Sequence, residues 1–282
     1  ALSRFNHFEQ SNMLCLRSKI HSTNLMMINF FKKPNEKIFN LTKLDQDTLL
    51  YRVLPRMLLE ILRKYFRLEV VGIENIPKKG PAIVIPNHSG YSGFDAIVLA
   101  HIIAEECKRV PRVLTHHLWF LNESTAIPAQ KMGFTEATFE NGINALKKKN
   151  LIVLFPEGEH GNFKPTAQSY ELQEFKRGFV RMALQMDCPI IPTLVIGAEE
   201  THINLSKLKF SKFLRGLVLP LPLNILPLPA KWKIVFLKPI KLPYEKSALE
   251  DHELVHEIAA EIQEQMQEQL NKILKKRKSL FF

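Results

Sequence analysis

The chain has 282 residues, of which 46% are hydrophobic and 24% are charged, a balance typical of a globular protein with a sizeable core. This composition excludes a disordered chain, a collagen-like fibre and a disulfide-rich scaffold. Lys and Arg number 39 against 28 Asp and Glu, which gives a formal net charge of +11. The excess favours an anionic partner, which could be nucleic acid, an acidic membrane, or a phosphorylated or CoA-linked substrate.

Cysteines and long apolar runs are scarce. The three cysteines, Cys15, Cys107 and Cys188, are far apart and show no metal-binding spacing, so reduced thiols in a cytosolic setting are expected. The most apolar window, 213–230, is interrupted by Arg215 and four prolines, whereas a spanning helix needs roughly 18 or more apolar residues. We therefore expect a protein that does not span a membrane but can lie on one.

The first segment, 1–45, carries scattered charges and lacks the apolar core of a signal peptide. We expect it to be a poorly structured leader. From Leu49 to Phe66 apolar residues recur at helical spacing with basic residues between them, which predicts a basic amphipathic helix started or interrupted by Pro55. Two interpretations are open for this helix: it packs on the core with a solvated basic face, or it rests on anionic headgroups.

Short β-rich apolar runs alternate with helical stretches through the middle of the chain. The expected strands are 68–73, 82–85, 112–115, 151–155, 190–196 and 233–237, and the expected helices are 94–107, 141–149 and 173–186. Strands that alternate with helices in this way indicate an α/β fold, with a mostly parallel sheet flanked by helices. We place this domain at 46–245.

The C-terminal segment, 246–282, predicts a long amphipathic helix with a basic end. An apolar stripe with steps of four consists of Leu254, Ile258, Ile262, Met266, Leu270 and Leu274. Acidic residues gather in the first turns and basic residues at the end, an order that suits the helix dipole. The pattern fits a helix packed on the domain, and its basic end also fits binding to anionic lipid.

The segment PAIVIPNHSGYSGFDA joins an expected strand to an expected helix. The strand runs directly into Asn87 and His88, and Asp95 lies at the start of the helix. A histidine in this position lies where open α/β sheets bind their ligands, and Gly90 and Gly93 permit a tight turn that lets Asp95 reach it. Such a pair can act as a general base. The alternative is that Asp95 is a helix N-cap and His88 an ordinary loop residue.

A second polar turn, PEGEHG, begins at Pro156 directly after the expected strand 151–155. The carboxyl ends of parallel strands meet at one edge of a sheet, so this turn and His88 should lie at the same edge. A third apolar strand, PIIPTLV, starts at Pro189.

These three segments together resemble one family. NH…D after a strand, then FPEG, then a strand that contains IP, in this order and at these separations, is similar to the phospholipid and glycerolipid acyltransferase family. That family includes glycerol-phosphate and lysophosphatidate acyltransferases. The resemblance covers 70–239, and the ordered set of motifs carries it rather than any single motif.

The resemblance implies a mechanism for the first segment. His88 would be the general base that activates the acceptor hydroxyl, and Asp95 would orient the imidazole and support its protonated form. The hydroxyl would attack the thioester of acyl-CoA or acyl carrier protein directly, without a covalent acyl-enzyme. The thioester is a substrate, so no metal or bound cofactor is expected.

The resemblance also implies binding residues. Asn87, Glu157 and Gly158 would belong to the substrate-binding site, and Glu157 and Gly158 match the block associated with acceptor binding and with the shape of the site. Pro192 matches the block that lines the acyl-donor side.

Two departures from the family pattern matter. Six residues separate His88 from Asp95, whereas the familiar block has four, so a longer turn must bring them together. The second block usually ends with a phosphate-binding arginine, but here the sequence MGF at 132–134 is followed by TEA. This change weakens the case for glycerol 3-phosphate or lysophosphatidate as the acceptor.

If a phosphate is bound, Lys164, Lys176 and Arg177 are the nearest candidates downstream of FPEG. The alternatives are that they are solvated surface charges, or that the acceptor has no terminal phosphate, as in a mono- or diacylglycerol. His116 and His117 are adjacent and so point different ways, which indicates structural roles.

The stretch LVLPLPLNILPLP, at 217–229, is strongly apolar and rich in proline. The prolines forbid a regular helix or a central strand. It is either an extended segment packed over the core or a lip beside the acyl site that dips into the bilayer interface.

We therefore expect an O-acyltransferase that moves a fatty acyl group from acyl-CoA or acyl carrier protein to a glycerolipid or lysophospholipid hydroxyl in phospholipid or glycerolipid biosynthesis. Expected partners are the thioester donor, the lipid acceptor and an anionic membrane surface, and the expected location is peripheral, on the cytosolic face of a membrane. Nucleic acid is not expected, because no nucleic-acid module is recognisable. The open alternatives are a non-glycerol lipid acceptor and a non-catalytic lipid- or nucleic-acid-binding protein.

Overall fold

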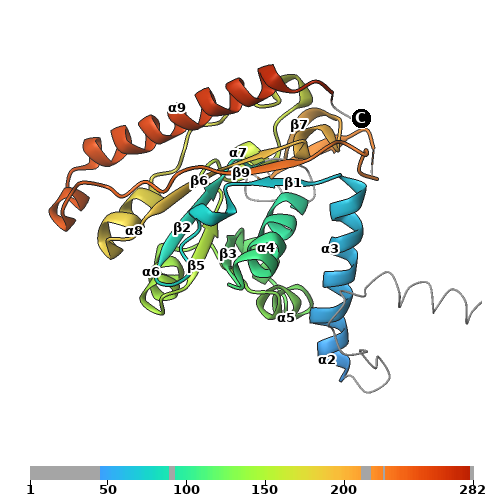
Figure 1. Ribbon diagram of the computed structural model, residues 1–282, viewed down its shortest axis with the longest axis horizontal. Coiled ribbons are helices and arrows are strands. Elements are labelled where there is room, and N and C mark those ends of the chain that lie inside the picture. The colour runs from blue at the N-terminus through green and yellow to red at the C-terminus, as the bar shows by residue number, and fades with distance from the viewer. Residues whose placement is uncertain (1–44, 89–92, 211–216, 225, 280–282) are drawn as a thin grey trace, which may run out of the picture. The chain divides into compact units, whose positions relative to one another are not determined.

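The computed structural model describes residues 45–88, 93–210, 217–224 and 226–279 (Figure 1). The chain divides into two compact units, 1–49 and 50–282. In the first unit the described residues include the short helix α2 (Gln46–Thr48), and the expected leader otherwise lies outside the described residues. The second unit contains everything discussed below.

A seven-stranded sheet forms the centre of the second unit, in the order β1-β9-β6-β2-β5-β3-β4. Its strands are β1 (Glu69–Val71), β2 (Ala82–Pro86), β3 (Arg112–Thr115), β4 (Phe134–Glu136), β5 (Leu151–Leu154), β6 (Ile190–Ile196) and β9 (Lys233–Phe236). All neighbouring strands are parallel except β6 and β9. The expected α/β fold with a mostly parallel sheet is confirmed.

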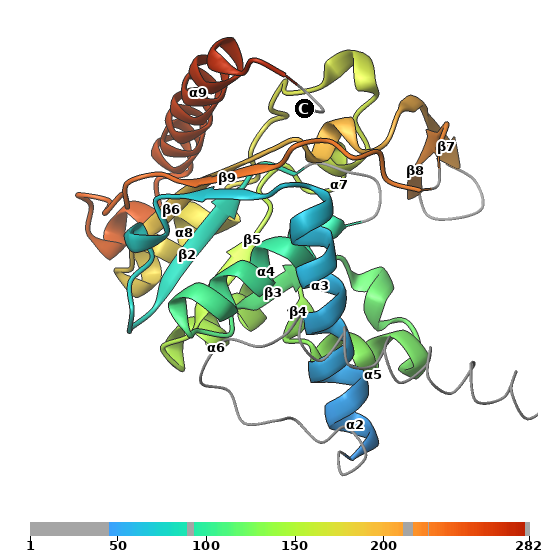
Figure 2. The ribbon, with the colours of Figure 1, turned by 45° about the vertical axis from the view of Figure 1, so that its right-hand side comes forward.

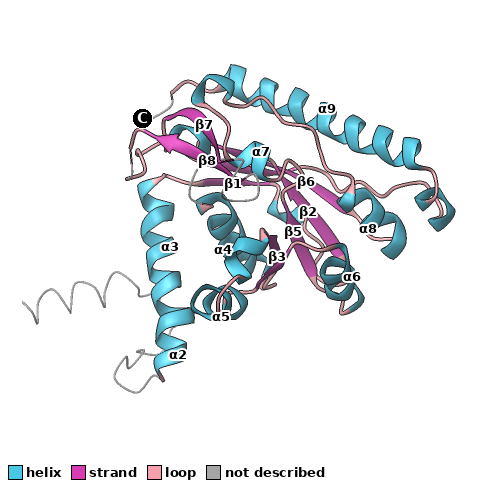
Figure 3. Ribbon diagram, turned by 180° about the vertical axis from the view of Figure 1, so that it is seen from behind, coloured by secondary structure: helices cyan, strands magenta, loops and turns pink. Residues whose placement is uncertain are grey.

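Helices cover both faces of this sheet (Figure 3). They are α3 (Leu54–Tyr65), α4 (Phe94–Cys107), α5 (Glu123–Lys131), α6 (Phe139–Lys147), α7 (Glu159–Asn162), α8 (Gly178–Met186) and α9 (His252–Lys276). Short 3₁₀ turns lie at Ile73–Asn75, His117–Phe120, Thr166–Gln168, Ala198–Glu200 and Lys246–Leu249.

Two hydrophobic clusters lie on opposite faces of the strands. Ile83 and Ile85 of β2 point into the cluster with α6, α8 and α9, whereas Val84 points into the cluster with α3, α4 and α5. This alternation follows from the two-residue period of a strand, and burial on both faces explains why β2 is apolar throughout. Strand β2, which leads into Asn87 and His88, is therefore packed by helices on both of its faces.

Most expected elements are present, with three differences. The helix expected at 173–186 begins at Gly178, because the backbone of 170–175 is bound by side chains of α9. Helix α5 and strand β4 were not expected; Pro128 lies inside α5 and hid its helical pattern. The helix expected at 49–66 is present as a π-helical turn, Leu49–Val53, followed by α3.

The proline-rich stretch contributes an extended strand. Strands β7 (Asn204–Phe210) and β8 (Leu217–Pro222) pair antiparallel in a separate two-stranded sheet, which Figure 2 shows apart from the seven strands. Within the described part of the chain, no helix combines the length and the apolar character that crossing a membrane requires.

Candidate active site

Asn87 fixes the end of β2 at the carboxyl edge of the sheet. Its side-chain amide donates to the Val195 carbonyl at 3.0 Å and accepts from the Val195 N–H at 2.7 Å. These two bonds continue the pairing of β2 with β6 by one residue. The contacts of Asn87 therefore hold the backbone that carries His88, while the substrate-binding role of Asn87 stays a prediction.

His88 and Asp95 form the expected pair. The Nδ1 atom of His88 lies 2.7 Å from Oδ2 of Asp95, so the six-residue separation does not keep the two side chains apart. Asp95 is fully buried in the first turn of α4 and also accepts the Ala96 N–H at 2.8 Å. The helix N-cap is Gly93, in the left-handed region at φ 67°, so the interpretation of Asp95 as the N-cap is wrong. Gly90 lies outside the described residues.

The surroundings of His88 suit a general base. An ionised Asp95 accepts a hydrogen bond from Nδ1–H, and this tautomer leaves Nε2 unprotonated. The Nε2 atom has no hydrogen-bond partner among the described residues, and the side chain is 15% exposed. The imidazole lies against Phe155, with 4.1 Å between ring centroids. One face of the ring is thus packed against Phe155.

Glu157 links the two motif-bearing turns. Its Oε1 accepts the backbone N–H of His88 at 2.8 Å, and its Oε2 accepts the backbone N–H of Gln173 at 2.8 Å. The side chain is fully buried, and a Cβ at Gly161 would lie only 2.5 Å from the Cβ of Glu157. Both carboxylate oxygens are therefore bound by the protein, and the predicted role of Glu157 in acceptor binding and in the shape of the site stays a prediction.

Lys164 is buried beside Glu157, so its prediction as a surface charge or phosphate ligand is wrong. Its Nζ lies 3.0 Å from Glu199 and 3.5 Å from Glu157 and donates to the Glu171 carbonyl at 3.1 Å. Burial raises the pKa of Glu199 to about 7, against the opposing effect of Lys164. An ammonium held by two carboxylates cannot also bind a substrate phosphate.

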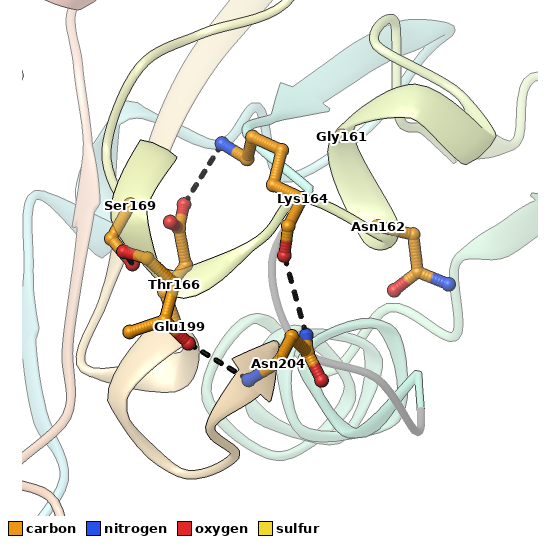
Figure 4. Close-up of a pocket in the computed structure, with 7 residues that line it drawn as sticks. All are labelled: Gly161, Asn162, Lys164, Thr166, Ser169, Glu199 and Asn204. Carbon is orange, nitrogen blue, oxygen red and sulfur yellow. Dashed lines mark hydrogen bonds and ion pairs between the residues drawn. The ribbon is translucent and has the colours of Figure 1, made fainter. Parts of the chain in front are cut away.

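A small cavity lies beside this ion cluster (Figure 4). It is lined by Gly161, Asn162, Lys164, Thr166, Ser169, Glu199 and Asn204. Asn204 binds Lys164 and Thr166, since its backbone N–H donates to Thr166 Oγ1 at 2.8 Å and its side chain donates to the Lys164 carbonyl at 3.3 Å. The cavity volume of about 10 Å³ admits about one water molecule and no substrate.

The absence of a side chain at Gly158 leaves room for a second cation, the ammonium of Lys176. Its backbone has φ 59° and ψ −146°, a region that is essentially restricted to glycine. A Cβ there would lie 2.9 Å from Nζ of Lys176, so the Lys176 ammonium lies directly over the FPEG turn. Lys176 is exposed, and its ammonium has no ion pair among the described residues. Arg177 is also exposed and lies at the start of α8.

His116 and His117 lie near the same turn. The expectation that they point different ways is wrong, since their ring centroids are 4.2 Å apart. The two residues do not share one helix or strand, because His117 begins a 3₁₀ turn and His116 is its N-cap. Nε2 of His116 lies 4.0 Å from Glu159 of α7. Burial, followed by the neighbouring His117, lowers the pKa of His116. His116 also caps the 3₁₀ turn that follows it, by accepting the Leu118 N–H at 3.3 Å, which agrees with a structural role.

Pro192 lies inside the sheet rather than beside His88. It is buried in β6, level with Ile85 of β2, and its carbonyl accepts the Leu237 N–H at 2.9 Å. A central strand tolerates this proline because its missing N–H faces β9, which ends at Phe236. Its predicted role on the acyl-donor side stays a prediction.

Several residues of this region had no motif to reveal them. They are Gln173, Glu199, Gln263 and Gln267. The sequence offers a signal only for Gln263 and Gln267, which lie four residues apart beside the apolar stripe of α9 and therefore on one side of the helix.

The fold and the site together define an α/β protein with a histidine–carboxylate pair at the carboxyl edge of a parallel sheet, an arrangement suited to general-base chemistry. Residues 67–196 match the family model described as Acyltransferase. The match covers the segment that carries the NH…D, FPEG and IP motifs.

The chain is also similar to individual proteins. An uncharacterized protein of Mycobacterium tuberculosis is 34% identical over 233 residues, which are 78% of this chain and 65% of that protein. The chain thus spans slightly less than two thirds of this relative. A 1-acyl-sn-glycerol-3-phosphate acyltransferase of Limnanthes alba is 29% identical over 174 residues, 57% of this chain and 53% of the relative. The crystal structure of the LPA acyltransferase PlsC of Thermotoga maritima matches with a TM-score of 0.45 and 17% identity, over 77% of this chain and 85% of the other.

Proposed function

We propose that the protein transfers a fatty acyl group from acyl-CoA or acyl carrier protein to the hydroxyl of a glycerolipid or lysophospholipid. The observation that carries the proposal is the His88–Asp95 contact of 2.7 Å, within the segment that matches the family model described as Acyltransferase.

The proposed reaction follows from the roles of these groups. Nε2 of His88 takes the proton of the acceptor hydroxyl, whose oxygen attacks the thioester carbonyl. Asp95 stabilises the imidazolium that forms. The tetrahedral intermediate then releases the thiol, which receives the proton from the imidazolium, and an ester remains on the acceptor. The thioester is already an activated acyl group, so the proposed step needs no cofactor.

A glycerolipid acceptor is supported by the relative from Limnanthes alba, whose name describes acylation of 1-acyl-sn-glycerol 3-phosphate. The test is acyl transfer from labelled acyl-CoA and acyl carrier protein to lysophosphatidate, neutral lysolipids, mono- and diacylglycerol, and an ornithine lipid. Transfer to a glycerolipid supports the proposal, and transfer to the ornithine lipid alone identifies a non-glycerol acceptor. Lipid binding without any transfer favours the non-catalytic alternative.

Lys176 is proposed to bind an anionic group on the acceptor, because its ammonium lies over Gly158, next to the buried Glu157. Lys176→Ala should raise KM for lysophosphatidate by about tenfold, which corresponds to the loss of one charge-assisted contact of roughly 1.4 kcal/mol. KM for monoacylglycerol should not change. Steady-state kinetics with both acceptors measure this difference.

Arg177→Ala is the matched control, since it removes a neighbouring exposed cation at the start of α8. It should leave both KM values unchanged. Equal effects of the two variants on lysophosphatidate would show general electrostatic attraction rather than a specific contact.

Membrane binding is proposed to occur through the outer face of α3. Leu54, Leu58, Ile61 and Tyr65 form a stripe that is 41% to 55% exposed. Arg56 and Arg63 turn away from this stripe and pair with Glu105 and Glu106 of α4 at 3.1 and 2.9 Å. Among residues with described side chains, the exposed part of α3 thus combines this apolar stripe with the basic residues Arg56 and Lys64.

The stripe continues into the proline-rich stretch. The hydroxyl of Tyr65 donates to the Pro227 carbonyl at 2.7 Å, next to Leu226, which is 81% exposed, and Leu223, which is 66% exposed. An apolar helix face joined to exposed leucines suits insertion at the interface of a bilayer.

Liposome flotation tests this surface. A Leu58→Glu/Ile61→Glu variant should lose binding to anionic vesicles by about tenfold or more, because each buried apolar side chain contributes about 1.5–3 kcal/mol. Val110→Glu changes an apolar residue that is 66% exposed away from this stripe and should float like the wild type. Unchanged flotation of the double variant would contradict the proposed surface.

A further inference from the structure

Two glutamines of α9 bind the backbone of the segment 170–175. The amide of Gln267 accepts from the Leu172 N–H at 2.8 Å and donates to the Tyr170 carbonyl at 2.9 Å. One turn earlier, Gln263 accepts from the Phe175 N–H at 3.0 Å and donates to the Leu172 carbonyl at 3.4 Å. We call this arrangement of Gln263 and Gln267 the glutamine clasp.

The clasp determines the conformation of the segment that it holds. Side-chain amides satisfy backbone groups that would otherwise pair within a helix, and α8 accordingly begins only at Gly178. With the segment extended, the backbone N–H of Gln173, which lies between the two clasp contacts, points at Glu157 and donates to Oε2 at 2.8 Å.

Glu157 connects the segment 170–175 to His88. Its other oxygen accepts the backbone N–H of His88 at 2.8 Å, and the carboxylate is fully buried, so it cannot relax toward water. A continuous series of short contacts therefore runs from α9 through Gln173 and Glu157 to His88. Each link is a hydrogen bond to a backbone group, which fixes position rather than charge.

Attachment of α9 to the domain does not depend on the clasp. The helix already buries Val255, Ile258, Ile262, Met266 and Leu270 against the sheet. The glutamines lie beside this stripe and are partly buried, where apolar side chains would fill the same space. Their specific contribution is the four hydrogen bonds to the segment 170–175.

We propose that Gln263 and Gln267 are positioning residues for acyl transfer, which hold His88 in place through the segment 170–175 and Glu157. The inference rests on the proposed function, in which His88 is the base. Small displacements of a catalytic group lower the rate strongly, so loss of the clasp should lower kcat while substrate binding is retained.

The first test is the Gln263→Met/Gln267→Met double variant. Methionine keeps the length and the apolar contacts but removes the hydrogen bonds, and it is an equally good helix former. We expect kcat to fall by about 10- to 100-fold, with KM for donor and acceptor changed by less than about threefold. Gln265→Met is the matched control; Gln265 is exposed and bonds only Glu261 of its own helix at 3.1 Å. It should have wild-type kcat.

A double-mutant cycle separates positioning through Glu157 from a general structural effect. In a Glu157→Gln background, whose residual activity is measured first, the clasp variant should lower kcat by less than about twofold further, because coupled residues are not additive. If the clasp variant lowers kcat by a further 10- to 100-fold in the Glu157→Gln background, the inference is overturned. It is also overturned if the clasp variant leaves kcat unchanged in the wild-type background. If the double variant does not fold, the two single variants are carried through the same cycle.

The assay includes His88→Ala, so the two proposals fail differently. If wild-type activity does not depend on His88, the proposed function fails. If it does, but the clasp variant has wild-type kcat or is additive with Glu157→Gln, only the clasp inference fails.

Discussion

Replacing His88 with alanine should lower kcat/KM for acyl transfer by about 10²–10⁴-fold, the usual contribution of a positioned general base. The imidazole provides the acceptor for the hydroxyl proton, and Asp95, at 2.7 Å, supports its protonated form. Initial rates with a labelled acyl thioester and the preferred acceptor measure the effect.

His252→Ala provides the control, since His252 is exposed at the start of α9. It should retain wild-type kcat/KM. Circular dichroism and urea unfolding establish that both variants are folded. A folded His88→Ala protein with wild-type activity would remove His88 from the mechanism, and the lipid-binding alternative would become the better account.

The second large effect concerns stability. Lys164→Met should reduce the free energy of unfolding by about 3–5 kcal/mol, the typical result of removing one partner from a buried ion pair. Lys164 has a 2% exposed side chain within 3.0 Å of Glu199 and 3.5 Å of Glu157. Methionine would leave two carboxylates near each other without a cation. Urea unfolding at pH 8 measures the change, since this pH lies above the pKa of about 7 of Glu199 in the wild type.

Lys233→Met is the matched control for this measurement. Lys233 forms an ion pair with Glu69 at 2.7 Å, but the two side chains are 33% and 45% exposed. Exposed pairs contribute about 0–1 kcal/mol, so this variant should lie close to the wild type. A loss below about 1 kcal/mol for Lys164→Met would mean that the buried cluster is solvated or rearranges.

The sequence predicted the sheet edge that carries the candidate site because its signal is local. An apolar run that ends in Asn87 and His88, and another that ends before Glu157, are enough to place both turns at one edge of a parallel sheet. The register of β2 with β5 and the bond from His88 to Glu157 agree with this placement. The strands themselves were predictable for the same reason, since burial on both faces makes them apolar throughout.

The residues that support this edge were not predictable, because their partners lie far away in the chain. Lys164 and Glu199 meet across 35 positions, and neither has a motif; a lone lysine is assigned to the surface by default. The segment 173–177 has helical composition but precedes α8, because Glu157, Gln263 of α9 and the Pro156 carbonyl bind the backbone N–H groups of Gln173, Phe175 and Lys176. Such tertiary contacts override local propensity, and they can be found only when the fold is known.

The clasp contacts also bear on how the protein is synthesised. Leu172 and Gln267 are separated by 95 positions, and the last strand of the sheet, β9, ends at Phe236, so a chain that emerges residue by residue completes the sheet before the partner of this segment exists. Contacts of such long range form late in folding, after the entropy of closing the intervening loop has been overcome. Until then, the segment 170–175 has no partner on α9 and Glu157 lacks its restraint from that side. A nascent chain from which α9 has not yet emerged therefore holds His88 without the support that the glutamine clasp gives it in the folded protein.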